Sequence, residues 1–251
     1  MLVKSAIAEL MGSFAITFFG SFARLTNTKE DYLSIGLSYF FLISAMTYCF
    51  VHFSGAQFNP FLTAALVITK QMEVIKGILN IIAQFIGSFL AGLAMFAIYV
   101  FPADEELHRD YGQPTLSENQ FYGGLGLEFF SIFILTYVYC SLMMNVKAPK
   151  YIIGIALASV YAASVICFGH LNGGCVSFIE IFGPSVFSGK LGELIYYAIV
   201  QCLGALFSAF IFAFILQEHA NIIHPDYDEN NLPSVGNNTL GLKEDEGQDD
   251  D

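Results

Sequence analysis

The chain has 251 residues, of which 55% are hydrophobic and 13% charged, and its mean hydropathy is +0.61. This composition is typical of a membrane protein and excludes an ordinary soluble domain. The formal net charge of −12 does not describe the apolar part, because ten acidic residues and one lysine lie from Glu218 onward.

Six apolar segments are long enough to cross a bilayer, for which a helix needs about 20 residues. They run from about Ser5 to Leu25, Leu33 to Val51, Val74 to Phe101, Gly123 to Met144, Tyr151 to Phe168 and Leu191 to Leu216. We therefore expect an all-α, multi-pass integral membrane protein in contact with the lipid bilayer. Whether that membrane is plasma, vesicular or organellar is open at this point.

A shorter apolar segment follows the second span. Asn59 and Pro60 predict a helix start, because an asparagine side chain caps early N–H groups and proline has no N–H to leave unpaired at the first helical position. The apolar run ends near Lys70, about half the length needed to cross. Such a half-helix must be buried in protein or line a watery cavity.

The second half of the chain repeats this plan. His170 to Ser177 aligns with His52 to Asn59, and a second short apolar run follows, which we expect to end at Gly183 and Pro184. Glu9 aligns with Glu128, and Gln84 with Gln201, at nearly the same offset. Each half has three full spans, so the second half inserts upside down and the two half-helix N-termini meet near the midplane.

The chain thus divides into a membrane domain, residues 1–217, and an acidic tail, residues 218–251. Repeat one covers residues 5–101 and repeat two residues 123–217. The tail's composition predicts a solvated, disordered segment, with an acidic docking segment as the alternative. The chain has no basic patch that would indicate a nucleic-acid partner.

This arrangement resembles the aquaporin or major intrinsic protein family over about residues 5 to 217. Ser54 to Thr63 is similar to the family's first Asn-Pro-Ala loop, with Phe61 in place of alanine. Phe182-Gly183-Pro184 is similar to the tripeptide that follows the second loop. The resemblance implies an aquaporin-like fold of six transmembrane helices plus two re-entrant half-helices in an inverted repeat. It also implies a homotetramer.

The second loop departs from the family pattern. Counting back from Phe182, the second Asn-Pro-Ala-Arg falls on Ser177, Phe178, Ile179 and Glu180. A hydroxyl therefore replaces an amide donor, and a carboxylate replaces the arginine that repels cations. By the same resemblance, the other constriction positions are Tyr39, Val165 and Gly174. The missing arginine predicts a weaker barrier to cations.

Glu180 has two interpretations. Ser177 to Glu180 has the S-x-x-E form of a capping box, in which Glu180 only caps the second half-helix. In the other interpretation Glu180 faces an open pore, attracts cations and gates conduction by protonation. A cation or proton leak through Glu180 is then a third functional possibility.

Bulky residues stand at the junction of the half-helices. Phe61, Phe178 and Ile179 either fill the lumen and exclude water or turn into the bundle and pack there. Asn59 is expected to serve both as helix cap and as a donor to the lumen.

Other polar residues are predicted to support the loops. We expect Glu9 and Glu128 to accept hydrogen bonds from loop backbone N–H groups. His52 and His170 are predicted to be hydrogen-bonded structural residues of the loops rather than metal ligands. We predict no metal site and no cofactor, and the sequence has no catalytic motif that would indicate an enzyme.

Two functions remain open. The first is an aquaporin-like channel that passively passes water or small neutral solutes, with conduction either impaired by the altered second loop or not. The second is a non-conducting, aquaporin-like structural or accessory subunit of a larger membrane complex, with other subunits as its partners.

Overall fold

The computed structural model describes residues 2–26, 31–100, 111–114, 116, 121–145 and 148–216. Its six long helices are α1 (Leu2–Leu25), α2 (Tyr32–Phe50), α4 (Val74–Val100), α5 (Phe121–Met143), α6 (Ile153–Asn172) and α8 (Leu194–Phe210). A 3-10 turn, η2 (Lys150–Ile152), precedes α6, and a π-helical segment, η3 (Ile211–Leu216), continues α8. All six candidate spans are long and apolar enough to cross a membrane. The acidic tail lies outside the described residues.

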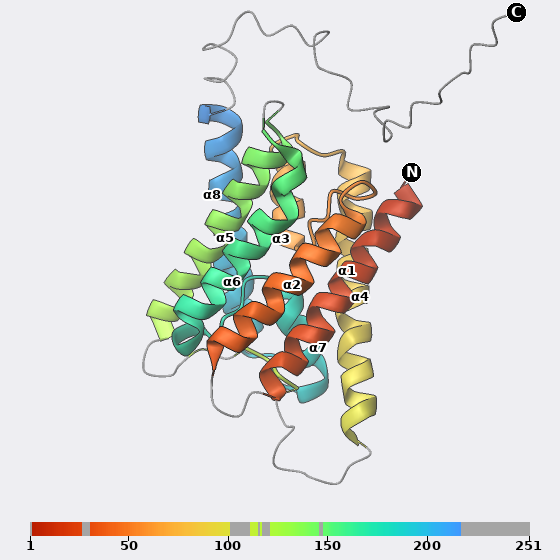
Figure 1. Cartoon of the computed structure of the whole chain (residues 1–251), viewed down its shortest axis with the longest axis vertical. Coiled ribbons are helices and arrows are strands. Elements are labelled where there is room, and N and C mark those ends of the chain that lie inside the picture. The colour runs from red at the N-terminus through yellow and green to blue at the C-terminus, as the bar shows by residue number, and fades with distance from the viewer. Residues whose placement is uncertain are drawn as a thin grey trace, which may run out of the picture.

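Two short helices complete the bundle, α3 (Pro60–Ile68) and α7 (Phe178–Ser188). They lie in opposite halves of the bundle, α3 towards the end where α1 begins and α7 towards the other end (Figure 1). The Asn59 side chain accepts hydrogen bonds from the N–H groups of Phe61 (2.9 Å) and Leu62 (3.1 Å). The predicted cap of the first half-helix is therefore confirmed, as is the all-α fold with six spans and two half-helices.

The predicted end of the second half-helix at Gly183 and Pro184 is wrong, because α7 continues to Ser188. Proline has no N–H to donate to the preceding turn, and this usually ends or kinks a helix. Here Ser88 of α4 relieves the disturbance. Its hydroxyl accepts from the Gly183 N–H at 2.9 Å and donates to the Ile179 carbonyl, to which Thr17 also donates at 3.0 Å. Neighbouring helices thus satisfy the Gly183 N–H and the Ile179 carbonyl beside the proline, in a membrane interior where backbone polar groups need partners within the protein.

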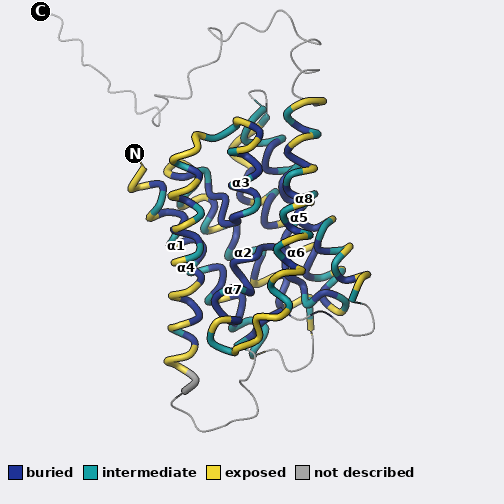
Figure 2. The backbone as a smooth tube through the Cα atoms, turned by 180° about the vertical axis from the view of Figure 1, so that it is seen from behind, coloured by how far each residue is buried: buried dark blue, intermediate teal, exposed yellow. Residues whose placement is uncertain are grey.

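The packing of the spans follows the sequence repeat. In repeat one α1 lies along α4, in repeat two α5 lies along α8, and α2 packs against α6 across the two halves. Close contact depends on glycines at equivalent positions: a Cβ on Gly87 would lie 2.3 Å from the Leu10 carbonyl oxygen, and one on Gly204 2.6 Å from that of Phe129. Small residues are the expected means of helix association where lipid supplies no hydrophobic drive. Buried residues line the interior and exposed ones the outer faces (Figure 2).

Candidate functional site

The two half-helices meet at their N-termini, as the repeat predicts. Asn59 Nδ2 lies 3.5 Å from the Val176 carbonyl oxygen, and Ser177 Oγ donates to the Phe58 carbonyl oxygen at 3.1 Å. Each cap residue therefore donates to the loop that precedes the opposite helix. These paired contacts bring together the positive ends of two helix dipoles in the middle of the bundle.

The first loop is held by Glu9 of α1. Its carboxylate accepts from the N–H groups of Gln57 (3.0 Å) and Phe58 (2.8 Å) and from Gln84 Nε2 (2.6 Å). Ala56 and Phe58 have positive φ values of 52° and 44°, a backbone conformation that L-residues rarely adopt. Such strain persists only where the surroundings fix the backbone. The two hydrogen bonds that the Gln57 and Phe58 N–H groups donate to Glu9 fix it here.

The second loop is held in a different way from the one expected. The Glu128 carboxylate accepts from Asn172 Nδ2 (2.7 Å) and Gln201 Nε2 (2.9 Å), and Asn172 Oδ1 accepts from the Gly174 N–H (2.9 Å). Glu128 therefore orients Asn172, and Asn172 contacts the loop backbone. Asn172 was not among the support residues predicted from the sequence.

The predicted role of the two histidines needs correction. His52 and His170 are both exposed, and neither ring forms a hydrogen bond with another described residue. The His52 ring packs against Phe53 at 5.4 Å between centroids, and the His170 ring against Tyr32 at 4.5 Å. His170 also lies in the last turn of α6 rather than in a loop, because that helix runs four residues further than predicted.

Glu180 lies in the first turn of α7, where its side chain is only 1% exposed. It closes the predicted capping box, since Oε1 accepts from the Ser177 N–H at 3.0 Å and from the Val176 N–H at 3.3 Å. Two phenols also donate to it, Tyr161 to Oε1 and Tyr39 to Oε2, both at 2.6 Å. The carboxylate thus points into a set of donors, which is the capping arrangement rather than one facing an open pore.

Arg24, which was not among the site residues predicted from the sequence, completes this cluster. The guanidinium of Arg24, near the end of α1, forms an ion pair with Glu180 Oε2 at 3.2 Å. It also donates to the carbonyl oxygens of Gly173 (3.2 Å) and Gly174 (2.7 Å) and to the Tyr39 hydroxyl. The expectation that this region lacks a fixed positive charge is therefore wrong. Arg24 on α1 supplies a positive charge to this region, and the ion pair of Arg24 and Glu180 has no net charge.

One sequence signal could have identified Arg24. The buried face of α1 includes Gly12, Ile16 and Gly20, and Arg24 is the next residue at a spacing of four. Gly20 has a specific role there, because a Cβ at this position would lie 2.1 Å from the Tyr39 hydroxyl oxygen. The missing side chain at Gly20 gives Tyr39 room to reach the ion pair.

The remaining constriction positions lie close to this cluster. Tyr39 and Tyr161 stack with their ring centroids 5.4 Å apart, and a Cβ on Gly174 would lie 3.2 Å from Val165 Cγ1. Arg24 Cζ lies 5.0 Å from the centroid of the Tyr39 ring, within cation–π range. The structure therefore brings together Tyr39, Gly174, Val165 and Glu180, and adds Arg24 and Tyr161 to them.

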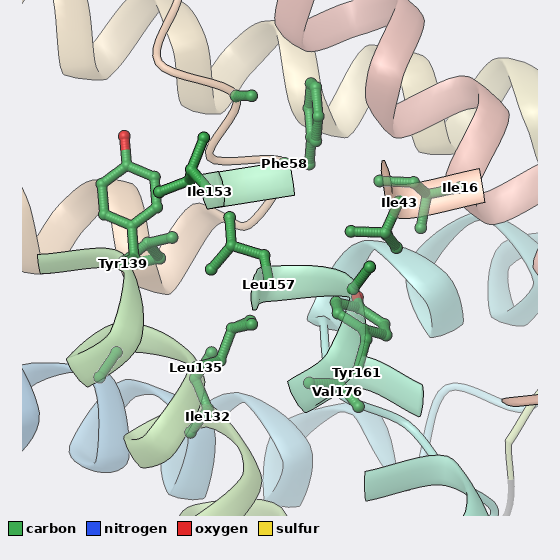
Figure 3. Packing of buried hydrophobic residues seen from close by; sticks show 14 of the residues in the cluster. Ile16, Ile43, Phe58, Ile132, Leu135, Tyr139, Ile153, Leu157, Tyr161 and Val176 are labelled. Atoms are coloured by element: carbon green, nitrogen blue, oxygen red, sulfur yellow. The ribbon is translucent and has the colours of Figure 1, made fainter. Parts of the chain in front are cut away.

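A small cavity of about 20 Å³ lies beside this cluster, on the side of the first loop. Residues of α1, α2, α3, α5, α6 and the first loop line it: Ile16, Ile43, Thr47, Ala56, Gln57, Phe58, Leu62, Leu135, Leu157 and Tyr161. Figure 3 shows several of these side chains converging. A volume of this size holds about one water molecule. The Thr47 hydroxyl is buried in this lining without a hydrogen-bond partner among the described residues.

The three bulky junction residues, Phe61, Phe178 and Ile179, pack against other side chains of the bundle. Phe178 and Phe61 pack edge to face at 5.4 Å, and Phe178 also contacts Phe85 of α4 at 6.0 Å. Neither ring lines the cavity. Ile179 is fully buried in the same hydrophobic cluster as Ile16 and Val176. For the two phenylalanines the packing alternative therefore describes the structure better than the lumen-filling one.

Comparison with known proteins shows similarity along nearly the whole chain. The profile of a family described as "Major intrinsic protein" matches residues 1–212. The glycerol uptake facilitator protein-like 6 of Lactiplantibacillus plantarum is 27% identical over 215 residues, which cover 83% of this chain and 96% of that protein. An aquaporin of Enterocytozoon bieneusi is 27% identical over 244 residues, covering 86% of this chain and 97% of its own length.

A solved structure shows the same fold. The aquaglyceroporin from Plasmodium falciparum superimposes with a TM-score of 0.73 and 16% sequence identity, covering 88% of this chain and all of that one.

Proposed function

Because the chain belongs to the major intrinsic protein family, we propose that it is a membrane pore protein that passively passes water or small neutral solutes. The observation that carries this proposal is the meeting of two opposed half-helices, with Asn59 donating to Val176 and Ser177 to Phe58. Two of the similar proteins are named as an aquaporin and as a glycerol uptake facilitator, which suggests water and glycerol as the first solutes to test.

Selection in such a pore would depend on width and electrostatics. The two half-helix N-termini point at the same central region, where their positive ends disfavour cations and protons. On one side of the junction, the apolar residues Ile43, Leu135 and Leu157 line the cavity and offer little to replace the water around an ion. On the other side, the paired charges of Arg24 and Glu180 leave no net charge.

The side chains leave very little free space in this conformation. The cavity has room for about one water molecule, and Tyr161 separates it from Glu180. Passage beyond the cavity therefore requires the Tyr161 and Tyr39 side chains to move. Tyrosine rotation requires breaking hydrogen bonds to Glu180, so we expect permeation to be slow compared with an unobstructed pore.

The test is stopped-flow swelling of reconstituted vesicles, in gradients of an impermeant osmolyte and of glycerol. We expect the wild type to swell or shrink faster than empty liposomes. Leu157→Ala should raise the rate several-fold, because Leu157 lines the cavity and is 5% exposed. Ile155→Ala is the matched control, because Ile155 lies on the same helix but is 51% exposed on the outer face. Wild type and Leu157→Ala both equal to empty liposomes would contradict a conducting function.

The second candidate is the non-conducting accessory subunit, and the narrowness of the cavity favours it. Purification of the full chain in a mild detergent separates the two candidates. A stable complex with other membrane proteins, together with impermeable vesicles, supports the accessory role. A homotetramer that purifies without other subunits and conducts supports the channel.

A further inference from the structure

We propose that Arg24 and Glu180 together determine ion exclusion in this pore, Arg24 being the residue that keeps the Glu180 carboxylate from attracting cations. This inference rests on the proposed pore function and deepens it. It assigns a specificity role to an arginine on α1, a helix that the second-loop sequence does not point to.

The position of the pair supports this role. Tyr161 lines the cavity, and its hydroxyl donates to Glu180, so the pair lies directly beyond the cavity wall. The pair also lies between the two halves of the chain, with Arg24 on α1 and Glu180 on α7. A solute that leaves the cavity past Tyr161 would therefore meet this pair.

The contacts of Arg24 fix its charge in place. Its guanidinium donates to two backbone carbonyls of the second loop, those of Gly173 and Gly174, as well as to Glu180. The Arg24 side chain is 9% exposed, and the Glu180 side chain 1%. An arginine held by several acceptors at a buried site is less free to leave than one on a surface. The pair is therefore a stable part of the constriction.

The charge balance at this point decides what is excluded. Five donors surround the Glu180 carboxylate, but four of them are neutral, and Arg24 alone cancels its charge. The other basic residues that the structure describes, apart from histidines, are lysines at helix ends or in connections, at positions 4, 70, 76, 150 and 190. Removal of either member leaves one unpaired charge at a narrow, poorly hydrated point, where it attracts ions of the opposite sign.

The experiment is a charge cycle in planar bilayers, with a potassium chloride gradient and with vesicle swelling measured in parallel. Arg24→Gln should give a cation-selective current at least tenfold above wild type. Glu180→Gln should give a current that reverses at the opposite sign. The double variant and Arg24→Lys should be as ion-tight as wild type. Lys150→Gln, which removes an exposed charge far from the pair in sequence and outside the passage, is the control and should carry no current.

The outcomes separate this inference from the proposed function. If wild type passes water but both single variants stay ion-tight, the pair does not determine ion exclusion. If wild type passes no solute but Arg24→Gln passes cations, the pair is the barrier and the proposed function is wrong.

If one single variant does not fold, the other single variant decides. If neither single variant folds, the double variant decides. A monodisperse double variant that leaves the bilayer ion-tight supports the inference that the two charges compensate each other. A double variant that does not fold overturns this inference.

Discussion

Single polar residues do most to position the loops of this protein. Glu9 lies in a helix surrounded by apolar segments, yet each oxygen of its carboxylate accepts from a backbone N–H of the first loop. A buried N–H without an acceptor costs about 1–3 kcal/mol, and lipid supplies no water to replace the acceptor. Glu128 does the equivalent work through the Asn172 side chain. Both halves thus use a glutamate to hold a loop, but Glu9 contacts the loop backbone directly and Glu128 acts through Asn172.

Substitution at Glu9 should therefore destabilise the first loop. Glu9→Ala removes the acceptor of the Gln57 and Phe58 N–H groups and should lower stability by about 3 kcal/mol, summed over two unsatisfied donors. Glu9→Gln keeps one acceptor oxygen and should therefore lose clearly less stability than Glu9→Ala. Circular-dichroism melting in detergent measures both. If Glu9→Ala melts at the same temperature as the wild type, the loop does not depend on this carboxylate.

The sequence predicted the local parts of the site and missed the distant ones. The Ser177–Glu180 capping box and the Asn59 cap depend on residues within three positions of each other, so their pattern is visible in the sequence. Arg24 and Glu180 are far apart in the sequence and meet only because α1 and α7 pack together. No local pattern encodes that contact. The sequence showed that Glu180 stands where the family has an arginine. It did not show that Arg24 compensates for the negative charge of Glu180.

At the scale of the elements, α7 shows how a helix can pass through a proline. The sequence predicted its start correctly and its end too early, because the Gly183-Pro184 signal is normally a stop. Ser88 on α4 and Thr17 on α1 supply the hydrogen bonds that allow it to continue. The six spans were predicted within a few residues, since long apolar runs depend on lipid thickness and not on particular neighbours.

Gly183 should tolerate no side chain. A Cβ at this position would lie 2.0 Å from the Ser88 backbone oxygen, so Gly183→Ala must move α7 away from α4. We expect a loss of about 3 kcal/mol or more, the upper part of the range for overpacking. Gly126→Ala is the control: nothing lies within 4 Å of its added Cβ, and helix propensity favours alanine by about 1 kcal/mol. The melting temperature should therefore fall for Gly183→Ala and rise for Gly126→Ala. Equal shifts of the two melting temperatures would contradict the close α4–α7 contact.

At the scale of the whole molecule, the two repeats insert in opposite directions. The half-helices begin at a shared central contact and run towards opposite ends of the bundle (Figure 1). The segments that follow α3 and α7 must then emerge on opposite faces of the membrane. This arrangement was predictable because the repeat holds an odd number of full spans.

Cysteine labelling tests this topology. Glu73 follows α3, Gly192 follows α7, and both are exposed. In sealed vesicles of one orientation, a membrane-impermeant maleimide should label either Glu73→Cys or Gly192→Cys, but not both. In vesicles of the reverse orientation the labelled variant should change. The unsubstituted protein, with its own five cysteines, gives the background. Labelling of both variants from the same side would contradict the inverted repeat.

The bond between Arg24 and Glu180 also bears on how this chain could have diverged. Each residue comes from a different half of the chain, and either one alone would leave a buried charge that is strongly unfavourable. A lineage can therefore gain or lose the pair only by crossing a disfavoured intermediate or by changing both codons in close succession. The ion pair thus couples substitutions at these two positions energetically, although the positions lie in different halves of the chain.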